Sequence, residues 1–198
     1  DTLRYRIGVA TYSVGVAYNN RKTSLQFIQQ EMNNITALSN ETCQLGIQSR
    51  NMVLYIAKKD SPQPIRLMSS VGKQLPLYCT GLGRALLAYK SEEEIRNLFP
   101  EVLTAYTPHT IATINDLLKE LELTRQRGYA VEHEETNLMV NCIAVSLDYN
   151  NAPIAALSIS IPTFRISESK EKEAVQILWE AKQRIETHFK MYGVDFGN

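Results

Sequence analysis

Two neighbouring segments near the C-terminus, NCIAVSLDY at 141–149 and PIAALSISI at 153–161, alternate between bulky apolar residues and small ones. Successive side chains of a β-strand point to opposite faces of the sheet, so the pattern predicts two strands, each with one bulky and one small-residue face. Asn150 and Asn151 between them are typical of a tight turn. The chain must therefore contain an antiparallel hairpin whose bulky face is covered by helices.

The second face of this hairpin carries small residues and few charges. Its members are Cys142, Ala144, Ser146, Ile154, Ala156, Ser158 and Ser160. Such a face is either solvated, as in many antiparallel sheets, or it is a concave wall that leaves room for a ligand. Because cysteine and alanine are poor choices for a wet surface, we favour the pocket over the solvated face.

The remaining segments are assigned from their apolar periodicity and turn residues. They are, in chain order, helices over about 7–17 and 25–38, strands over 41–48, 52–59 and 65–72, short helices over 83–89 and 92–99, a helix over 114–127, a strand over 129–135 and a long helix over 168–192. This order predicts an α+β domain, with an antiparallel sheet of about six strands flanked by helices that include a long first and a long last helix.

Charge and cysteine content exclude several classes of protein. Lysine plus arginine and aspartate plus glutamate both number 21, so this chain gives no electrostatic reason to bind nucleic acid or a membrane surface. The three cysteines are far apart and form no C-x-x-C pair, which argues against a zinc knuckle or a disulfide framework. We expect reduced thiols in a cytoplasmic protein, and no apolar run is long enough to span a bilayer.

The stretch LYCTGLGRALLAY at 77–89 sets a glycine-containing turn directly before an apolar helix. The first N–H groups of a helix have no intrahelical partner and can receive an anion. If Gly81 and Leu82 close off the small-residue face, their N–H groups meet the hydroxyls of Ser158 and Ser160, a set that suits a small carboxylate. A tight strand-to-helix turn without a ligand is the other interpretation of the same glycines.

Four segments, in the order VGKQLPLYCTGLGRALLAY, RGYAVEHEE, CIAV and ALSISIPTFRIS, together resemble the effector-binding domain of IclR-type bacterial transcription regulators. The resemblance implies a GAF-like sensor domain over 21–198. It also implies that residues 1–20 are a linker segment from an N-terminal winged helix-turn-helix domain that would lie before Asp1. Such a regulator would be a homodimer or homotetramer that binds a small organic acid, a hydroxy- or oxo-carboxylate, and thereby changes its affinity for operator DNA.

The resemblance further implies which residues bind the acid. They are, in chain order, the apolar wall residue Leu67, Gly81 and Leu82 in the glycine-containing loop, Glu132, the cysteine ten positions later at Cys142, and the alternating Ser158 and Ser160. Two positions depart from the family's pattern. An aspartate often stands where this chain has Glu132, and a glycine commonly stands where it has Met139. We therefore transfer the class of ligand, a small organic acid, from the family to this chain, but not the identity of any one ligand.

Two other functions fit parts of the sequence. A GAF-like thiol-dependent enzyme would use Cys79 or Cys142 as its nucleophile, but the sequence places no histidine near either. A module that only oligomerises would bind no acid. Residues 132–135 alternate between the two faces of a strand and cannot all converge on one metal ion. We therefore expect a regulator without a catalytic site, a metal site or a cofactor.

Overall fold

The computed structural model describes residues 8–11, 14, 24–65 and 70–194 of the chain. Its helices are α2 (Ser24–Ser39), α3 (Gly81–Leu87), α4 (Glu92–Leu98), α5 (Ile114–Arg127) and α6 (Glu168–Tyr192), with a short 3₁₀ turn, η1 (Thr163–Arg165). Its strands are β1 (Thr42–Ser49), β2 (Met52–Lys59), β3 (Gln74–Pro76), β4 (Ala130–His133), β5 (Val140–Tyr149) and β6 (Ala152–Pro162). The predicted α+β class with an antiparallel six-stranded sheet is confirmed.

The six strands form one curled sheet in the order β3-β2-β1-β6-β5-β4, with every neighbouring pair antiparallel. The two central strands come from opposite ends of the chain, since β1 pairs with β6 and Gln44 lies directly opposite Ser158. The late hairpin turns at Asn150 and Asn151, both with positive φ, as predicted for these turn-forming residues.

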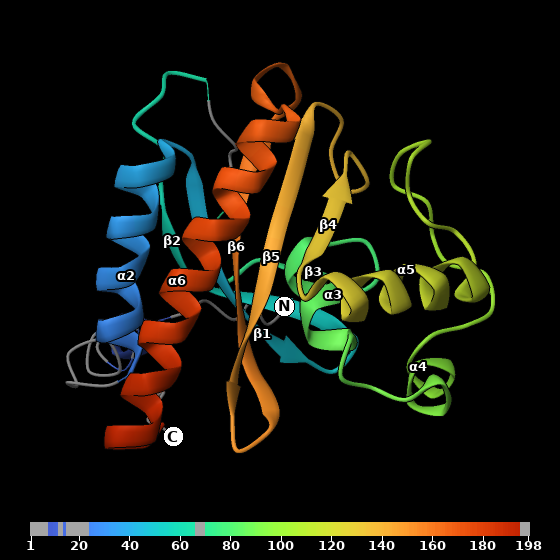
Figure 1. Cartoon of the computed structure of the whole chain (residues 1–198). Helices are drawn as coiled ribbons and strands as arrows, with labels where there is room; N and C mark the ends of the chain where they lie inside the picture. Colours follow the sequence, from blue (N-terminus) through green and yellow to red (C-terminus); the bar gives the residue numbers. More distant parts are fainter. Residues whose placement is uncertain (1–7, 12–13, 15–23, 66–69, 195–198) are drawn as a thin grey trace, which may run out of the picture.

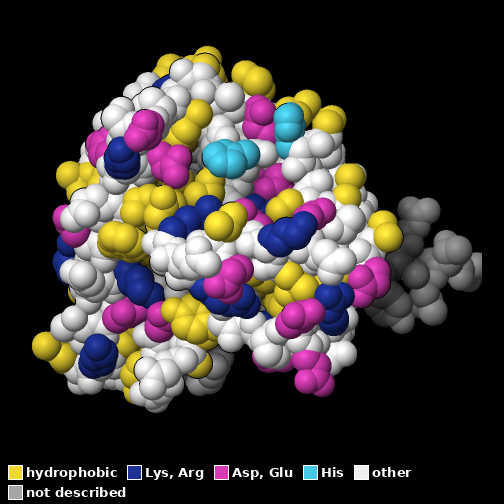
Figure 2. Space-filling model, turned by 45° about the vertical axis from the view of Figure 1, so that its right-hand side comes forward, with side chains coloured by type: hydrophobic (Ala, Val, Ile, Leu, Met, Phe, Trp, Pro, Cys, Tyr) yellow, Lys and Arg dark blue, Asp and Glu magenta, His cyan; other side chains and the backbone are white. Residues whose placement is uncertain are grey.

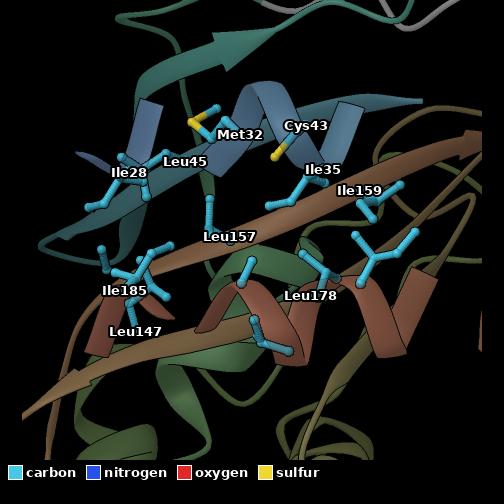
Figure 3. Packing of buried hydrophobic residues seen from close by; sticks show 14 of the residues in the cluster. Ile28, Met32, Ile35, Cys43, Leu45, Leu147, Leu157, Ile159, Leu178 and Ile185 are labelled. Carbon is cyan, nitrogen blue, oxygen red and sulfur yellow. The ribbon is translucent and has the colours of Figure 1, made fainter. Parts of the chain in front are cut away.

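Helices cover both faces of the sheet (Figure 1). The bulky face of β5 and β6 packs against α2 and α6 in one apolar cluster that includes Ile28, Leu157 and Leu178 (Figure 3). The small-residue face lies under α3, and its Ala144 and Ala156 belong to a second cluster with α3 and α5. Both alanines are fully buried, so the alternative of a solvated small-residue face is wrong.

Capping residues set the helix boundaries much as the sequence predicts. Ser91 and Glu94 form a reciprocal capping box at the start of α4, and the Thr113 hydroxyl caps α5 by accepting from the Asp116 N–H. The C-cap of α5 is Gly128, which adopts a left-handed φ of 78° that costs glycine little.

Three expectations need correction or lie beyond the described residues. The third described strand is Gln74–Pro76. Val71 and Gly72, at the end of the strand predicted over 65–72, form a turn instead, with Gly72 at a φ of 86° that suits a turn, and 66–69 lie outside the described residues. Leu38 ends the predicted apolar stripe of α2 but is 57% exposed, because the buried face of the helix continues from Ile35 to Ser39 and leaves Leu38 to one side. Of the predicted helix over 7–17, only 8–11 and 14 are described, and 9–11 and 14 are helical.

Candidate functional site

A narrow cavity lies between the small-residue face of the sheet and the start of α3. The described residues that line it are Gln44, Tyr55, Lys73, Leu75, Thr80, Gly81, Leu82, Glu132, Thr136, Asn137, Val140, Cys142 and Ser158. Five of the seven sequence-predicted site residues are among them. Ser160 lies just behind this lining, and Leu67 falls outside the described residues.

The glycines of the 77–89 stretch are needed for close packing. A Cβ on Gly81 would lie 3.3 Å from the Cβ of Cys142, so glycine lets α3 approach β5. A Cβ on Gly83 would lie 2.1 Å from the Leu77 carbonyl oxygen, which leaves room for no side chain. The Thr80 hydroxyl caps α3 by accepting from the Gly83 N–H, and both Gly81 and Leu82 are buried at the cavity wall.

The two predicted serines differ in their surroundings. Ser160 donates a hydrogen bond to the Gln44 side-chain oxygen at 2.9 Å, and its oxygen lies 3.2 Å from the Cys142 sulfur. Ser158 is 1% exposed, lines the cavity, and its hydroxyl has no hydrogen-bond partner among the described residues. Since buried polar groups are nearly always paired, the Ser158 hydroxyl is the exception in this site.

Glu132 is the buried acid of the cavity. It is 1% exposed, and its carboxylate accepts from the backbone N–H of Glu135 at 2.5 Å and of Thr136 at 3.3 Å. Burial raises the pKa of Glu132 to about 7, although the hydrogen bond from the Glu135 N–H acts in the opposite direction. Near neutral pH this side chain therefore exists in both its protonated and its charged form.

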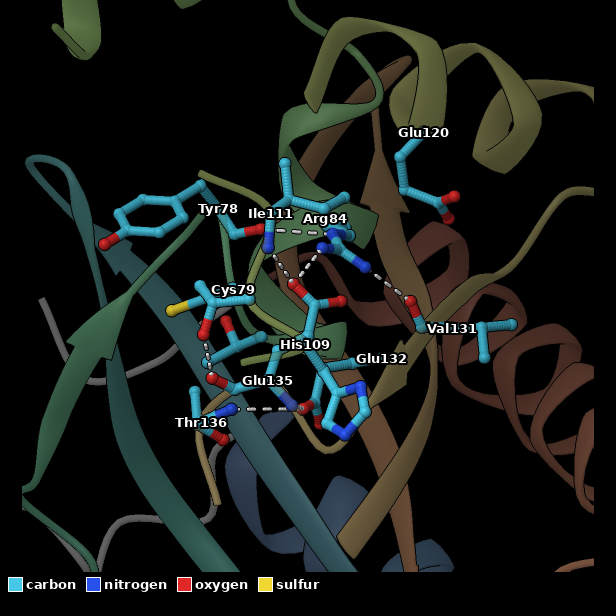
Figure 4. Close-up of polar contacts among 12 residues, drawn as sticks. Tyr78, Cys79, Arg84, His109, Ile111, Glu120, Val131, Glu132, Glu135 and Thr136 are labelled. Carbon is cyan, nitrogen blue, oxygen red and sulfur yellow. Dashed lines mark hydrogen bonds and ion pairs between the residues drawn. The ribbon is translucent and has the colours of Figure 1, made fainter. Parts of the chain in front are cut away.

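A buried ion pair fixes the loop that follows β4, three residues after Glu132. Arg84, on α3, reaches the Glu135 carboxylate at 2.6 Å, and its other N–H groups donate to the carbonyls of Tyr78 and Val131 (Figure 4). Glu135 also accepts from the Ile111 N–H at 3.1 Å. Arg84 and Glu135 are 2% and 4% exposed, so the pair ties α3, β4 and the 105–111 loop together in the interior.

Sequence reasoning missed several polar lining residues, among them Gln44, Tyr55 and Lys73. Gln44 stands between apolar Cys43 and Leu45 on β1, so a period of two applied to that strand places one amide among small side chains on the cavity face. Tyr55 is a buried tyrosine on β2. Lys73 is exposed and is the one cation among the described lining residues, but nothing in the local pattern marks it.

The cavity is small in this state. The space that the centre of a water molecule can reach is about 30 Å³, room for a water or two and not for an organic molecule. Cavities that bind small molecules are usually several hundred Å³. Occupation of this site by any organic ligand therefore requires its walls to move apart.

Met139 stands at the position where the resemblance predicts a glycine, and its backbone conformation shows why. Its φ is 66°, in the left-handed region that a side chain disfavours, and its own side chain is 57% exposed. The Glu134 carboxylate holds this conformation by accepting from the Met139 N–H at 2.6 Å and from the Thr163 hydroxyl at 2.9 Å. The chain thus keeps a glycine-like backbone at this turn while carrying an exposed methionine.

We expect Met139→Gly to raise the free energy of unfolding by about 0.5–1 kcal/mol, because removal of the left-handed strain exceeds the extra freedom of glycine in the unfolded chain. Chemical denaturation measures the change. Leu138→Gly is the matched control, since Leu138 is equally exposed at 56% but has an ordinary φ, and it should lower stability. If both variants lose stability to the same extent, position 139 is not strained.

The thiols are poorly suited to nucleophilic chemistry. Burial raises the pKa of Cys79 to about 12, and burial also raises the pKa of Cys142 well above its ordinary value. A thiolate is the reactive form of cysteine, so both groups are inert at neutral pH. The described residues contain no cluster of three histidine, cysteine or acidic side chains that suits a metal ion.

Acidic and basic side chains are interspersed over the face seen in Figure 2, without a continuous area of one sign. Within residues 8–11, 14, 24–65 and 70–194, no helix is both long enough and apolar enough to cross a bilayer.

Comparison with known proteins places the chain among regulators. A family model described as the C-terminal domain of the bacterial transcriptional regulator IclR matches residues 17–187. The HTH-type transcriptional regulator KdgR of Dickeya chrysanthemi is 33% identical over 187 residues, which cover 93% of this chain and 61% of KdgR. The repressor AllR of Escherichia coli K12 is 31% identical over 185 residues, which cover 92% of this chain and 68% of AllR.

Solved structures show the same fold. An IclR transcriptional regulator from Alicyclobacillus acidocaldarius matches with a TM-score of 0.84 and 28% identity, over 93% of this chain and 75% of that one. The C-terminal domain of Escherichia coli KdgR matches with a TM-score of 0.75 and 32% identity, over 83% and 96%. An IclR homologue from Microbacterium hydrocarbonoxydans, solved in complex with 4-hydroxybenzoate, has a TM-score of 0.79 at 23% identity, over 94% and 76%, a likeness that concerns the fold alone.

Proposed function

Because this chain belongs to the IclR family of bacterial transcriptional regulators and corresponds to its C-terminal domain, we propose that it binds a small hydroxy- or oxo-carboxylic acid in the cavity beneath α3. Binding would then change the affinity of the whole regulator for operator DNA. DNA contact through a separate N-terminal domain and assembly into a homodimer or homotetramer are parts of the same proposal.

The observation that carries the proposal is the unpaired hydroxyl of Ser158. A buried hydroxyl without a partner costs about 1–3 kcal/mol, and Ser158 faces a cavity lined by other polar groups. A ligand oxygen that accepts from this hydroxyl removes that cost when it binds. The position of the unpaired group therefore favours a ligand over a purely structural role for the small-residue face.

The lining supports an acid as that ligand. The Thr80 hydroxyl caps Gly83 and not Gly81 or Leu82, so the amide groups of the latter two are available to a carboxylate at the cavity wall. Lys73 adds a positive charge to the lining. Glu132, at the buried end of β4, would meet a hydroxyl or oxo group, since a second carboxylate beside it would be repelled unless one of the two is protonated.

The small free volume supports a sensor that responds by changing shape. If the ligand requires the walls to part, it binds the opened arrangement better than the closed one and shifts the population by that difference in affinity. The walls belong to α3, β5 and the loop after β4, and the Arg84–Glu135 pair fixes the position of α3 relative to that loop. A change in this relative position is the structural signal that the rest of a regulator would receive.

A thermal-shift screen of the 198-residue chain against glyoxylate, pyruvate, sugar acids and hydroxybenzoates tests the proposal. A ligand at a hundredfold excess over its Kd should stabilise the domain by about 2.7 kcal/mol. No shift with any acid would favour a module that only oligomerises.

Ser158→Ala should act in opposite directions with and without ligand. Removing a buried unpaired hydroxyl is expected to stabilise the free domain by about 1 kcal/mol, and it should weaken binding of the acid at least tenfold. Isothermal titration and denaturation measure the two effects. Ser160→Ala is the comparison, because that hydroxyl already donates to Gln44 and its loss should destabilise the free domain. Unchanged acid affinity in Ser158→Ala would show that the acid binds elsewhere.

A further inference from the structure

A second and larger cavity lies at the opposite end of α3. Its lining consists of Ala85, Ala88, Tyr89, Thr124, Arg125, Gly128, Tyr129, Val145 and Ser146. None of these residues lines the first cavity. The space that a water-sized centre can reach is about 200 Å³, against about 30 Å³ in the first. A cavity of about 150 Å³ is sufficient to hold benzene, so this one has room for a single-ring molecule.

The shape of this cavity is fixed by hydrogen bonds on both of its sides. On one side Arg125 donates to the carbonyls of Ala88 at 2.8 Å and Lys90 at 2.9 Å and pairs with Glu122, which joins the ends of α3 and α5. On the other side the Tyr89 hydroxyl bonds to Asp148 at 2.5 Å.

Further contacts hold the strand side of the cavity. The Ser146 hydroxyl donates to the Tyr89 oxygen at 3.1 Å, and Lys182 donates to the Ser146 carbonyl at 2.8 Å. Lys182 also pairs with Asp148, so the tyrosine, the serine and the ion pair form one network. Both sides of the cavity are therefore preformed and do not depend on a ligand for their geometry.

The lining indicates an uncharged aromatic ligand. Two tyrosine rings and the small side chains of Ala85 and Ala88 supply apolar area. Arg125 is the one charged residue in the described lining. Its guanidinium already donates to Glu122 and to two carbonyl oxygens, so few of its N–H groups remain to bind an anionic ligand. The Ser146 hydroxyl donates its proton to Tyr89, but its oxygen can still accept a hydrogen bond from a ligand hydroxyl.

We propose that this cavity is a second small-molecule site, which takes a neutral single-ring compound of the phenol type and is separate from the acid cavity. The two sites share α3 and β5, since Gly81 and Cys142 line the first cavity, and Ala85 and Val145 line the second.

Titration with phenol of the chain, labelled with ¹³C at alanine methyl groups and with ¹⁵N at backbone amides, tests the site. The Ala85 and Ala88 methyl signals should shift and saturate, whereas the Gly81 and Leu82 amide signals should not follow the same curve. Ala88→Leu places three extra carbons at the cavity wall and should weaken phenol binding at least tenfold. Ala105→Leu adds the same carbons on an exposed loop and should change the affinity less than twofold.

Three outcomes would overturn the proposal. The first is a linear, unsaturated response of the alanine signals to phenol. The second is equal phenol affinity in Ala88→Leu and Ala105→Leu. The third is binding of benzoate as tightly as phenol at the same alanines, which would contradict the neutral class of ligand. Failure of the acid screen leaves this titration unaffected, because the two sites have no lining residue in common.

Discussion

Arg84→Met is expected to lower the free energy of unfolding by about 3–5 kcal/mol, the cost of leaving one member of a buried ion pair without its partner. Methionine fills much of the volume of the arginine stem, so the loss reports on the charge and its hydrogen bonds. Glu135 would keep only the Ile111 N–H as a partner for the affected oxygen, and the Tyr78 and Val131 carbonyls would lose their donors. Equilibrium denaturation with urea measures the effect.

Arg96→Met is the matched control for this prediction. Arg96 makes as many side-chain contacts, with Glu92, Glu101 and Asn115, but it lies on the exposed surface of α4, where ion pairs contribute little. Adding Glu135→Gln to Arg84→Met should recover part of the loss, because the amide can still accept from Ile111 without burying a charge. Equal losses in the two arginine variants would show that the buried pair does not hold the domain together.

The second large effect is a pH dependence that Glu132 imposes on stability. Its pKa is about 7 in the folded domain and near 4.5 when unfolded, so the folded state binds more protons between these values. Stability must then fall as pH rises through this window. At 1.36 kcal/mol for each pKa unit, the loss between pH 4.5 and 7 is about 3 kcal/mol.

Glu132→Gln isolates this contribution, since the amide oxygen can still accept from the Glu135 and Thr136 N–H groups but never carries a charge. The free energy of unfolding of wild type, measured relative to that of Glu132→Gln, should be about 3 kcal/mol higher at pH 5 than at pH 8. Glu93→Gln, on the exposed start of α4, should give a flat difference over the same range. A flat curve for Glu132→Gln would mean that Glu132 is charged at both ends of the range.

Local rules predicted much of this fold because local forces decide the features concerned. The period of two on residues 141–149 and 153–161 identified both strands and the face that packs on α2 and α6. Side-chain caps at Ser91, Thr113 and Ser167 set helix starts, because they satisfy N–H groups only two or three residues away.

Features that depend on distant partners were beyond those rules. The Arg84–Glu135 pair joins residues 51 positions apart, and no spacing in the sequence marks it. The serines of β6 look equivalent by alternation, but Gln44 on β1 satisfies Ser160 and leaves Ser158 unpaired. The strand at Gln74–Pro76 was missed because it is only three residues long and ends in a proline, and its pairing with Met52–Leu54 is what defines it.

The pairing of β1 with β6 at the centre of the sheet has a consequence for synthesis. Residues 42–46 find their partners at 156–160, 110 to 118 positions later, so the middle of the sheet cannot close while the later residues are still inside the ribosome. At about 5–20 residues per second, the early hairpin of β1 and β2, which is complete at Lys59, waits roughly 5–20 seconds with one edge of β1 unpaired. Nascent chains should therefore be vulnerable to aggregation and proteases in this interval, and a chaperone that shields that edge should raise the yield of folded protein.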